Sequence, residues 1–116
     1  MGVLDELKKA AVVCAMAAAV CGASAASAEG ADSGRMLDLA KARNCLACHG
    51  VERKVLGPSF KEVAQKYADN SLVADKMASK ILRGGYGAWG MVPMPANPQV
   101  SEAESTQLAE WILRMK

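Results

Sequence analysis

Apolar side chains recur three or four positions apart in four segments of the chain. This spacing gathers them on one face of a helix, so each segment is predicted to form an amphipathic α-helix. In the last segment the buried face would consist of Leu108, Trp111, Ile112 and Met115. The four predicted helices span residues 34–43, 59–68, 72–83 and 102–115.

Residues near the ends of these segments support the predicted limits. Asn70 or Ser71 is the expected N-terminal cap of the third helix. Gly84 should end that helix, because glycine is favoured just past the last helical turn. The fourth helix is preceded by the spacing of a capping box, formed by Ser101 and Glu104. The fold class predicted from these segments is all-α.

A long irregular segment, residues 84–100, separates the third and fourth helices. Its composition excludes a regular helix or a central strand, because it contains Gly84, Gly85, Gly87, Gly90, Pro93, Pro95 and Pro98. Loops of this length in small domains are usually functional or disordered. This loop is too apolar for a solvated linker, since it also carries Tyr86, Trp89, Met91, Val92 and Met94. We therefore expect the apolar side chains of this loop to pack on another apolar surface and not to lie in solvent.

The first part of the chain has the pattern of a secretory signal peptide. Lys8 and Lys9 precede an apolar stretch over 10–20, and small residues follow up to Ala28. The apolar stretch is shorter than the roughly 20 residues that a membrane-spanning helix needs. We predict that residues 1–28 are removed on export to the periplasm, and that residues 29–116 form one domain without stable membrane insertion.

Two alternatives to a cleaved leader are open. The segment could be retained as an N-terminal membrane anchor. It could also direct lipid attachment at Cys21, although Val20 occupies a position where such sites usually have a small residue.

The net charge says little about the partner of the protein, because it is only +2 and no strongly basic stripe is present. Nucleic-acid binding is therefore not suggested.

The remaining cysteines lie in one short motif. Residues 45–49 read Cys-Leu-Ala-Cys-His, which matches the Cys-X-X-Cys-His attachment site of c-type haem. In this chemistry two thiols add to the two vinyl groups of one haem, and the next residue can reach the iron. We predict one covalent haem c, attached to Cys45 and Cys48, with His49 as an iron ligand.

Other uses of these residues are less favoured. A structural zinc site needs four ligands, whereas the chain after the leader offers two cysteines and one histidine, all in the motif. A thioredoxin-like dithiol would lie near a strand–helix–strand pattern, and none is predicted. A disulfide between Cys45 and Cys48 is possible in an oxidising compartment, but it would leave His49 and the apolar loop unexplained.

The second axial ligand of such a haem must come from another residue type, because His49 is the only histidine. The open choices are methionine, lysine, another group or a vacant position. Met94 is preferred, since Pro93 and Pro95 flank it and limit its backbone freedom. Met91, in the same loop, is the alternative. A methionine sulfur opposite histidine raises the reduction potential of a haem.

These motifs together resemble the short bacterial class I cytochromes c, the small electron carriers of respiration and denitrification. The resemblance covers nearly all of the chain after the leader, and it is carried by residues 44–50, 57–58, 87–90, 92–97 and 109–112. It implies the small class I cytochrome c fold, with about four helices wrapped around one covalent haem.

The resemblance also implies roles for matched positions. Pro58 would present its carbonyl to the outer nitrogen of His49 and fix the tautomer of the ring, with Gly57 allowing a close backbone approach. Trp89 would donate its indole N–H to a haem propionate. Asn97 would hydrogen-bond near the sulfur of the methionine ligand. The plainer interpretations are a turn proline, a core tryptophan and a turn asparagine.

The predicted function is that of a monomeric periplasmic electron carrier, not an enzyme. A cytochrome bc complex, a nitrite reductase or a terminal oxidase would suit as redox partner. The alternatives are a five-coordinate haem enzyme or gas-binding sensor, and a detachable haem domain of a larger complex. Electrons would cross at a haem edge surrounded by Leu46, Ala47, Val51, Leu56 and Met91, with Arg43, Arg53 and Lys54 available to steer acidic partners.

Overall fold

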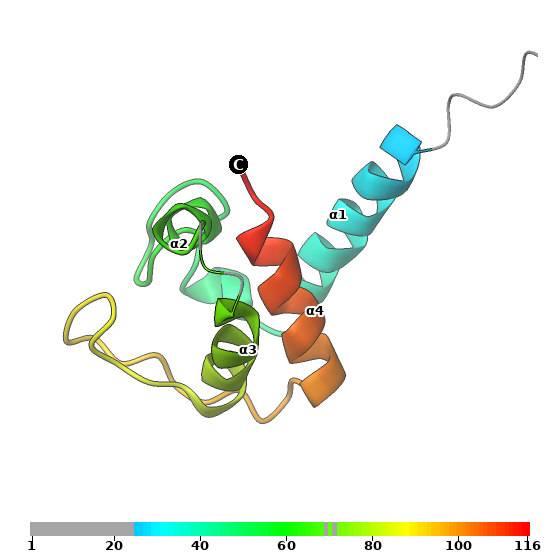
Figure 1. The fold of residues 1–116 in the computed structure, drawn as a ribbon. Coiled ribbons are helices and arrows are strands. Elements are labelled where there is room, and N and C mark those ends of the chain that lie inside the picture. The colour runs from blue at the N-terminus through cyan, green and yellow to red at the C-terminus, as the bar shows by residue number, and fades with distance from the viewer. Residues whose placement is uncertain (1–24, 69, 71) are drawn as a thin grey trace, which may run out of the picture.

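The fold consists of four α-helices and one short 3-10 turn, seen in a computed structural model that describes residues 25–68, 70 and 72–116. The elements are α1 (Ala25–Ala42), η2 (Cys45–Ala47), α2 (Phe60–Lys66), α3 (Val73–Arg83) and α4 (Glu102–Leu113) (Figure 1). Over the described residues no strand forms, and only two isolated β-bridges occur. The predicted all-α fold is confirmed.

Helix α4 lies at the centre of the structure (Figure 1). It packs against α1, α2 and α3. Its buried side consists of Ser105, Leu108, Ala109, Trp111 and Ile112. The predicted stripe is therefore confirmed at three positions, whereas Met115 lies beyond the helix end and packs on the core only in part. The other helices contribute to the same core through Met36, Ala40, Phe60, Val63, Ala78 and Ile81.

Helix α1 is longer than the predicted segment 34–43, because it begins at Ala25. Among the residues of α1 whose exposure is described, those that are buried, Met36 and Ala40, lie in its C-terminal half. The apolar pattern therefore predicted only the part of the helix that packs on the core. Residues 1–24 of the predicted signal peptide lie outside the described residues. The predicted cleavage point after Ala28 falls within α1 and stays a prediction.

Helix α2 begins one residue later than predicted, and its start is fixed by a reciprocal cap. The Oγ of Ser59 accepts a hydrogen bond from the Glu62 N–H (3.1 Å), and the Ser59 N–H donates to the Glu62 carboxylate (2.7 Å). The Ser-X-X-Glu spacing of this capping box is visible in the sequence. Because Ser59 is fully buried, the cap also fixes Pro58, the residue before it.

Helix α3 begins at Val73 and ends at Arg83, close to the predicted limits. The residue at the N-terminal cap is Leu72, without a side-chain cap bond, so the predicted cap, Asn70 or Ser71, is wrong. The side chain of Asn70 accepts a hydrogen bond from the Leu72 N–H (3.1 Å), outside the first helical turn. Ser71 itself lies outside the described residues. Gly84 ends the helix as predicted, with a φ of 72° that glycine adopts readily.

The predicted capping box of α4 is confirmed and is extended by an ion pair. The Ser101 Oγ accepts from the Glu104 N–H (3.1 Å), and the Ser101 N–H donates to the Glu104 carboxylate (3.0 Å). Arg43 donates two further hydrogen bonds to the same carboxylate, at 2.7 and 3.2 Å. One carboxylate therefore joins the start of α4 to the segment that follows α1. The bonds from Arg43, followed by that from Ser101, lower the pKa of Glu104 below its ordinary value.

We expect the replacement Glu104→Gln to destabilise the fold at neutral pH but much less in acid. A carboxyl with a lowered folded pKa contributes stability above its ordinary pKa of about 4.3 and loses it as pH falls through the folded value. Urea unfolding of wild type and variant at pH 7 and pH 3 measures this. Glu110→Gln, at an exposed site on the same helix, should change little at either pH. An equal gap between wild type and Glu104→Gln at both pH values would contradict the argument.

The segment after α3 folds back on itself as a narrow loop that extends away from the helices (Figure 1). Gly85 and Met94 pair through two backbone hydrogen bonds of 2.9 and 2.8 Å, which close the base of the loop. At its tip the Gly87 N–H donates to the Gly90 carbonyl (2.9 Å).

Among the described helices, none combines the length and the apolar character needed to cross a bilayer.

Candidate functional site

The Cys-X-X-Cys-His residues form a tight turn immediately after α1. Asn44 adopts the left-handed conformation (φ 65°) that asparagine tolerates, and this turns the chain into η2. The N–H groups of Cys48 and His49 both donate to the Cys45 carbonyl, at 3.2 and 3.0 Å. Both thiols are free and partly exposed. Burial raises the pKa of the Cys45 thiol above its ordinary value. The turn thus gathers both thiols and the imidazole.

The imidazole of His49 is held in one orientation by the Gly57-Pro58 segment. Its Nδ1 lies 2.7 Å from the Pro58 carbonyl oxygen, the contact that the family resemblance implied. A carbonyl only accepts hydrogen bonds, so Nδ1 carries a proton, and in the neutral imidazole Nε2 is then the nitrogen with the lone pair. The N–H of Gly57 donates to the Cys48 carbonyl (2.8 Å). The segment is therefore fastened to the motif at two points.

Gly57 makes this close approach possible. A β-carbon at this position would lie 2.6 Å from Cε1 of the His49 ring, closer than two carbon atoms can approach. Any side chain here would push the ring away from its partner carbonyl. The sequence signal for this role was the Gly-Pro pair that precedes the second helix.

We expect Gly57→Ala to displace His49 and to cost about 1–3 kcal/mol of stability, as overpacking of a filled site does. Two measurements check this: the free energy of unfolding, and the NMR shift and exchange rate of the His49 Nδ1 proton. Gly34→Ala is the matched control. A β-carbon at Gly34 meets nothing within 4 Å, and alanine is favoured over glycine by about 1 kcal/mol inside a helix. Equal effects of the two variants would disprove the packing argument.

An aromatic stack connects His49 to the core. The His49 and Phe60 rings lie 5.7 Å apart with an angle of 23° between their planes. Phe60 in turn meets the edge of Trp111 at 5.6 Å, with an angle of 70°. Phe60 is 3% exposed and Trp111 is 6% exposed. Because these two rings are fixed by packing, the face of the imidazole that meets them is fixed as well.

The two loop methionines have different surroundings. Met94 is half-buried and packs against the core, as does Cys45. Its backbone is paired with Gly85 at the base of the loop. Met91 is 85% exposed. The structure therefore brings Met94, not Met91, to the apolar core on which the haem motif also packs.

Asn97 fastens the loop to α3. Its side-chain amide donates to the Ile81 carbonyl (2.8 Å) and, at 3.4 Å, to the Pro95 carbonyl. Its backbone N–H donates to the Leu82 carbonyl (3.1 Å). In this structure the amide nitrogen is directed at backbone carbonyls, and its expected contact near the Met94 sulfur stays a prediction.

Trp89 lies at the tip of the loop and is 42% exposed, so the interpretation as a core tryptophan is wrong. The Nζ of Lys66 lies 4.4 Å from the centre of its ring. The same Nζ donates a 2.8 Å hydrogen bond to the carbonyl of Ala88. Sequence analysis missed Lys66, because nothing local in the sequence connects the end of α2 with a loop more than twenty residues away.

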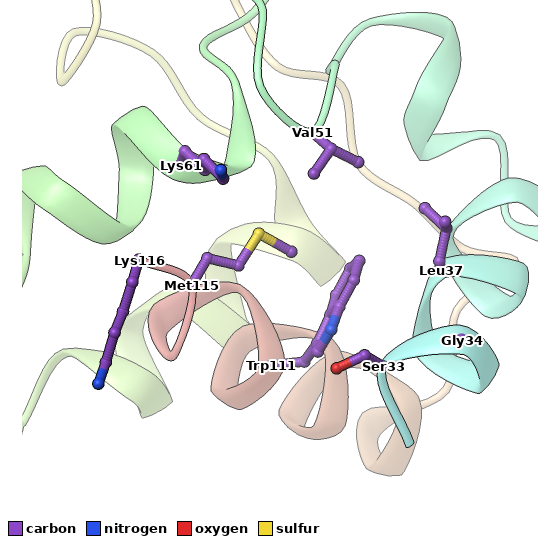
Figure 2. Close-up of a pocket in the computed structure, with 8 residues that line it drawn as sticks. All are labelled: Ser33, Gly34, Leu37, Val51, Lys61, Trp111, Met115 and Lys116. Carbon is purple, nitrogen blue, oxygen red and sulfur yellow. The ribbon is translucent and has the colours of Figure 1, made fainter. Parts of the chain in front are cut away.

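A hollow of about 340 Å³ opens between α1 and α4 (Figure 2). It is lined by Ser33, Gly34, Leu37, Val51, Lys61, Trp111, Met115 and Lys116. In Figure 2 Leu37 borders it from α1, while Trp111 borders it from α4. The hollow borders the site, since Trp111 belongs to the aromatic stack on His49 and Val51 is expected beside the haem edge, but none of the predicted covalent or axial haem residues lines it.

The residues present fit a covalently attached haem. Two free thiols stand within one turn of chain, and an imidazole directs its proton to a carbonyl and keeps the other nitrogen available. A half-buried thioether is carried by a proline-bounded loop. Fold and site together define a small all-α haem protein of the kind that carries electrons.

Comparison with known proteins gives the family. The Cytochrome c family model matches residues 37–116. Cytochrome c-552 of Nitrosomonas europaea is 53% identical over 79 residues, which are 68% of this chain and 77% of that protein. Cytochrome c-551 of Azotobacter vinelandii is also 53% identical over 79 residues, 68% of this chain and 95% of that protein.

A solved structure agrees with the fold. The crystal structure of wild-type Nitrosomonas europaea cytochrome c552 superposes with a TM-score of 0.67 and 52% identity, covering 69% of this chain and 99% of that chain. The chain belongs to the cytochrome c family and has the class I fold. It carries one covalent haem c and is a haem-based electron carrier, so the predicted family and cofactor are confirmed.

Proposed function

We propose that this chain carries single electrons in the periplasm through a haem c bonded to Cys45 and Cys48, with His49 and Met94 as axial ligands. The observation that supports this most is the 2.7 Å contact between His49 Nδ1 and the Pro58 carbonyl. It fixes the tautomer whose Nε2 can bind iron, and it orients the ring as partners of metal-ligating histidines do.

The chain's own residues set the properties of the site. When bound, the haem supplies a one-electron change between ferrous and ferric iron. Pro58 and Phe60 hold the His49 ring from its edge and its face. Pro93 and Pro95 restrict the backbone around Met94, whose soft sulfur favours the ferrous state and raises the reduction potential.

Trp89 is the proposed donor of a hydrogen bond to a haem propionate. Its indole N–H is the only hydrogen-bonding group of the side chain and can only donate, which suits a carboxylate. The partial exposure of Trp89 is consistent with a contact at the rim of the cofactor. Asn97 follows Met94 by three residues in the chain, and its side chain is proposed to lie near the Met94 sulfur.

The surface beside the motif suits a transient redox partner. Leu56 is exposed, and its N–H donates to the Cys48 carbonyl (3.1 Å), so this apolar side chain stands beside the motif. Arg53 and Lys54 are exposed on the same segment. Such charges raise the rate of encounter with acidic partners and act less at high salt. A cytochrome bc complex, a nitrite reductase or a terminal oxidase is the proposed partner.

Optical spectra of the purified, exported protein test the proposal. We expect the pigment to stay with the polypeptide in acidified organic solvent, because thioether bonds are covalent. The spectrum of the reduced protein should not change when carbon monoxide is added at neutral pH. Rapid carbon monoxide binding would instead support the five-coordinate enzyme or gas sensor. Recovery of the protein with the cytoplasmic fraction would contradict the proposed location.

A further inference from the structure

Lys66, the last residue of α2, makes two contacts with the tip of the loop that carries Met94. Its Nζ donates to the Ala88 carbonyl at 2.8 Å and lies 4.4 Å from the centre of the Trp89 ring. The second distance is within the range of cation–π attraction. One ammonium group therefore binds both the backbone and a side chain of the same turn.

The tip of this loop has few other attachments. Its base is closed by the Gly85–Met94 pair, and Asn97 ties the following residues to α3. Residues 86–93 lie between these points. Within the described part of the chain, their hydrogen bonds are the one from Gly87 to Gly90 and the one from Lys66. Both tip glycines have positive φ angles, 98° and 116°, where glycine moves freely.

Helix α2 connects the two segments on which the proposed ligation depends. Its N-terminal cap, Ser59, directly follows Pro58, whose carbonyl holds His49. Its C-terminal residue, Lys66, holds the tip of the Met94 loop. Since a helix is stiff along its axis, and since Phe60, Val63 and Ala64 bury this one in the core, it can fix the distance between the two attachments.

We propose that Lys66 is a positioning residue, which ties the loop tip to α2 and thereby slows the departure of Met94 from the iron. This inference rests on the proposed ligation by His49 and Met94. In the proposed movement the sulfur leaves as the loop swings outward, which opens the Gly85–Met94 pair and carries the tip away from α2. That movement breaks both contacts of Lys66 at once.

The contact is compatible with the role proposed for Trp89. A cation over an aromatic ring interacts with its face, whereas the indole N–H points outward in the plane of the ring. Lys66 therefore leaves this N–H free for a propionate. The plainer interpretation, a solvated lysine at a helix C-terminus, accounts for neither contact with the loop.

The test is the rate at which imidazole binds to the oxidised holoprotein. At high imidazole concentration this rate reaches a plateau, set by how often Met94 leaves the iron. We expect Lys66→Gln and Lys66→Met to raise the plateau about tenfold, a factor that two such contacts can supply. Lys66→Arg keeps the positive charge over the Trp89 ring and a donor for the Ala88 carbonyl, and should behave nearly like wild type.

Two controls separate this inference from the proposed function. Lys76→Gln removes the same charge from an exposed position on α3 and should leave the plateau unchanged. A plateau for Lys66→Gln equal to those of wild type and Lys76→Gln overturns the inference. If Met94→Ala and wild type bind imidazole at the same rate, Met94 is not a ligand. The proposed function then fails before any lysine variant is considered.

A second measurement does not depend on the iron. The Gly87 amide bonds to Gly90 at the loop tip, so its hydrogen exchange in the holoprotein reports opening of the tip. Lys66→Gln should accelerate this exchange about tenfold. Trp89→Leu should accelerate it as well, because it removes the ring contact and the proposed bond to a propionate. Unchanged exchange in Lys66→Gln overturns the inference.

Discussion

Replacing Met94 by alanine should open one side of the haem iron to added ligands and lower its reduction potential. The methyl side chain of alanine cannot reach or bind the metal, so carbon monoxide should bind the reduced variant rapidly. Axial ligands tune haem potentials over roughly 0.8 V, and loss of the thioether should account for a decrease on the order of 0.1–0.3 V. Optical spectra with carbon monoxide and a redox titration measure the two effects.

Met91→Ala is the matched control for this experiment. Met91 is 85% exposed, and its removal should leave both carbon monoxide binding and the reduction potential as in wild type. If instead both variants behave like wild type, neither loop methionine binds the iron. If carbon monoxide binds rapidly only to the Met91→Ala variant, Met91 and not Met94 is the axial ligand of the iron.

Replacing Trp111 by alanine should cost about 3–5 kcal/mol in the free energy of unfolding, the usual range for a buried aromatic residue. Trp111 is 6% exposed and meets Phe60, which stacks on His49. Loss of the indole would therefore leave a cavity beside the residue that positions the imidazole. Urea unfolding of the oxidised holoprotein gives the free energy.

The other tryptophan provides the comparison. Trp89 is 42% exposed at a loop tip, so Trp89→Ala leaves no buried cavity and should cost less, about 1–2 kcal/mol, from its contact with Lys66 and its proposed bond to a haem propionate. The two variants remove the same number of atoms. Similar losses of stability would contradict the assignment of Trp111 to the core.

The third and fourth helices could be predicted closely because their signals are local. In α4 the Ser101–Glu104 spacing encodes a cap that requires no distant residue. In α3 the terminal glycine adopts a φ angle that other residues avoid. Each of these helix ends depends on residues within one helical turn, so the local sequence is sufficient to predict it.

The limits of the first two helices could not be predicted accurately from the spacing of apolar residues. The first half of α1 buries no residue whose exposure is described, so an apolar periodicity could not mark it. In α2 the segment was predicted to begin at Ser59, yet this side chain caps the helix from outside. Serine and glutamate three positions apart form the spacing of a capping box, so this boundary was available from the sequence, as it was for Ser101 and Glu104.

The residues of the candidate site also fall into two groups, those predicted from local motifs and those whose contacts depend on tertiary packing. The cysteines, His49 and the loop methionines stand in short patterns whose chemistry follows from residue type. The bond from Asn97 to Ile81 and that from Lys66 to Ala88 join residues 16 and 22 positions apart. They depend on how the loop lies against α2 and α3, which the packing of the whole core decides. No local pattern could have predicted them.

The central place of α4 has a consequence for shortened chains. The other three helices of the described residues all pack on its buried side, and α4 follows them in the chain. A polypeptide cut or terminated before residue 102 would keep the haem-attachment motif but lose the support beneath the His49 stack. Such fragments should be degraded rather than work as smaller carriers, so every pigmented molecule recovered from cells should retain α4 (Glu102–Leu113).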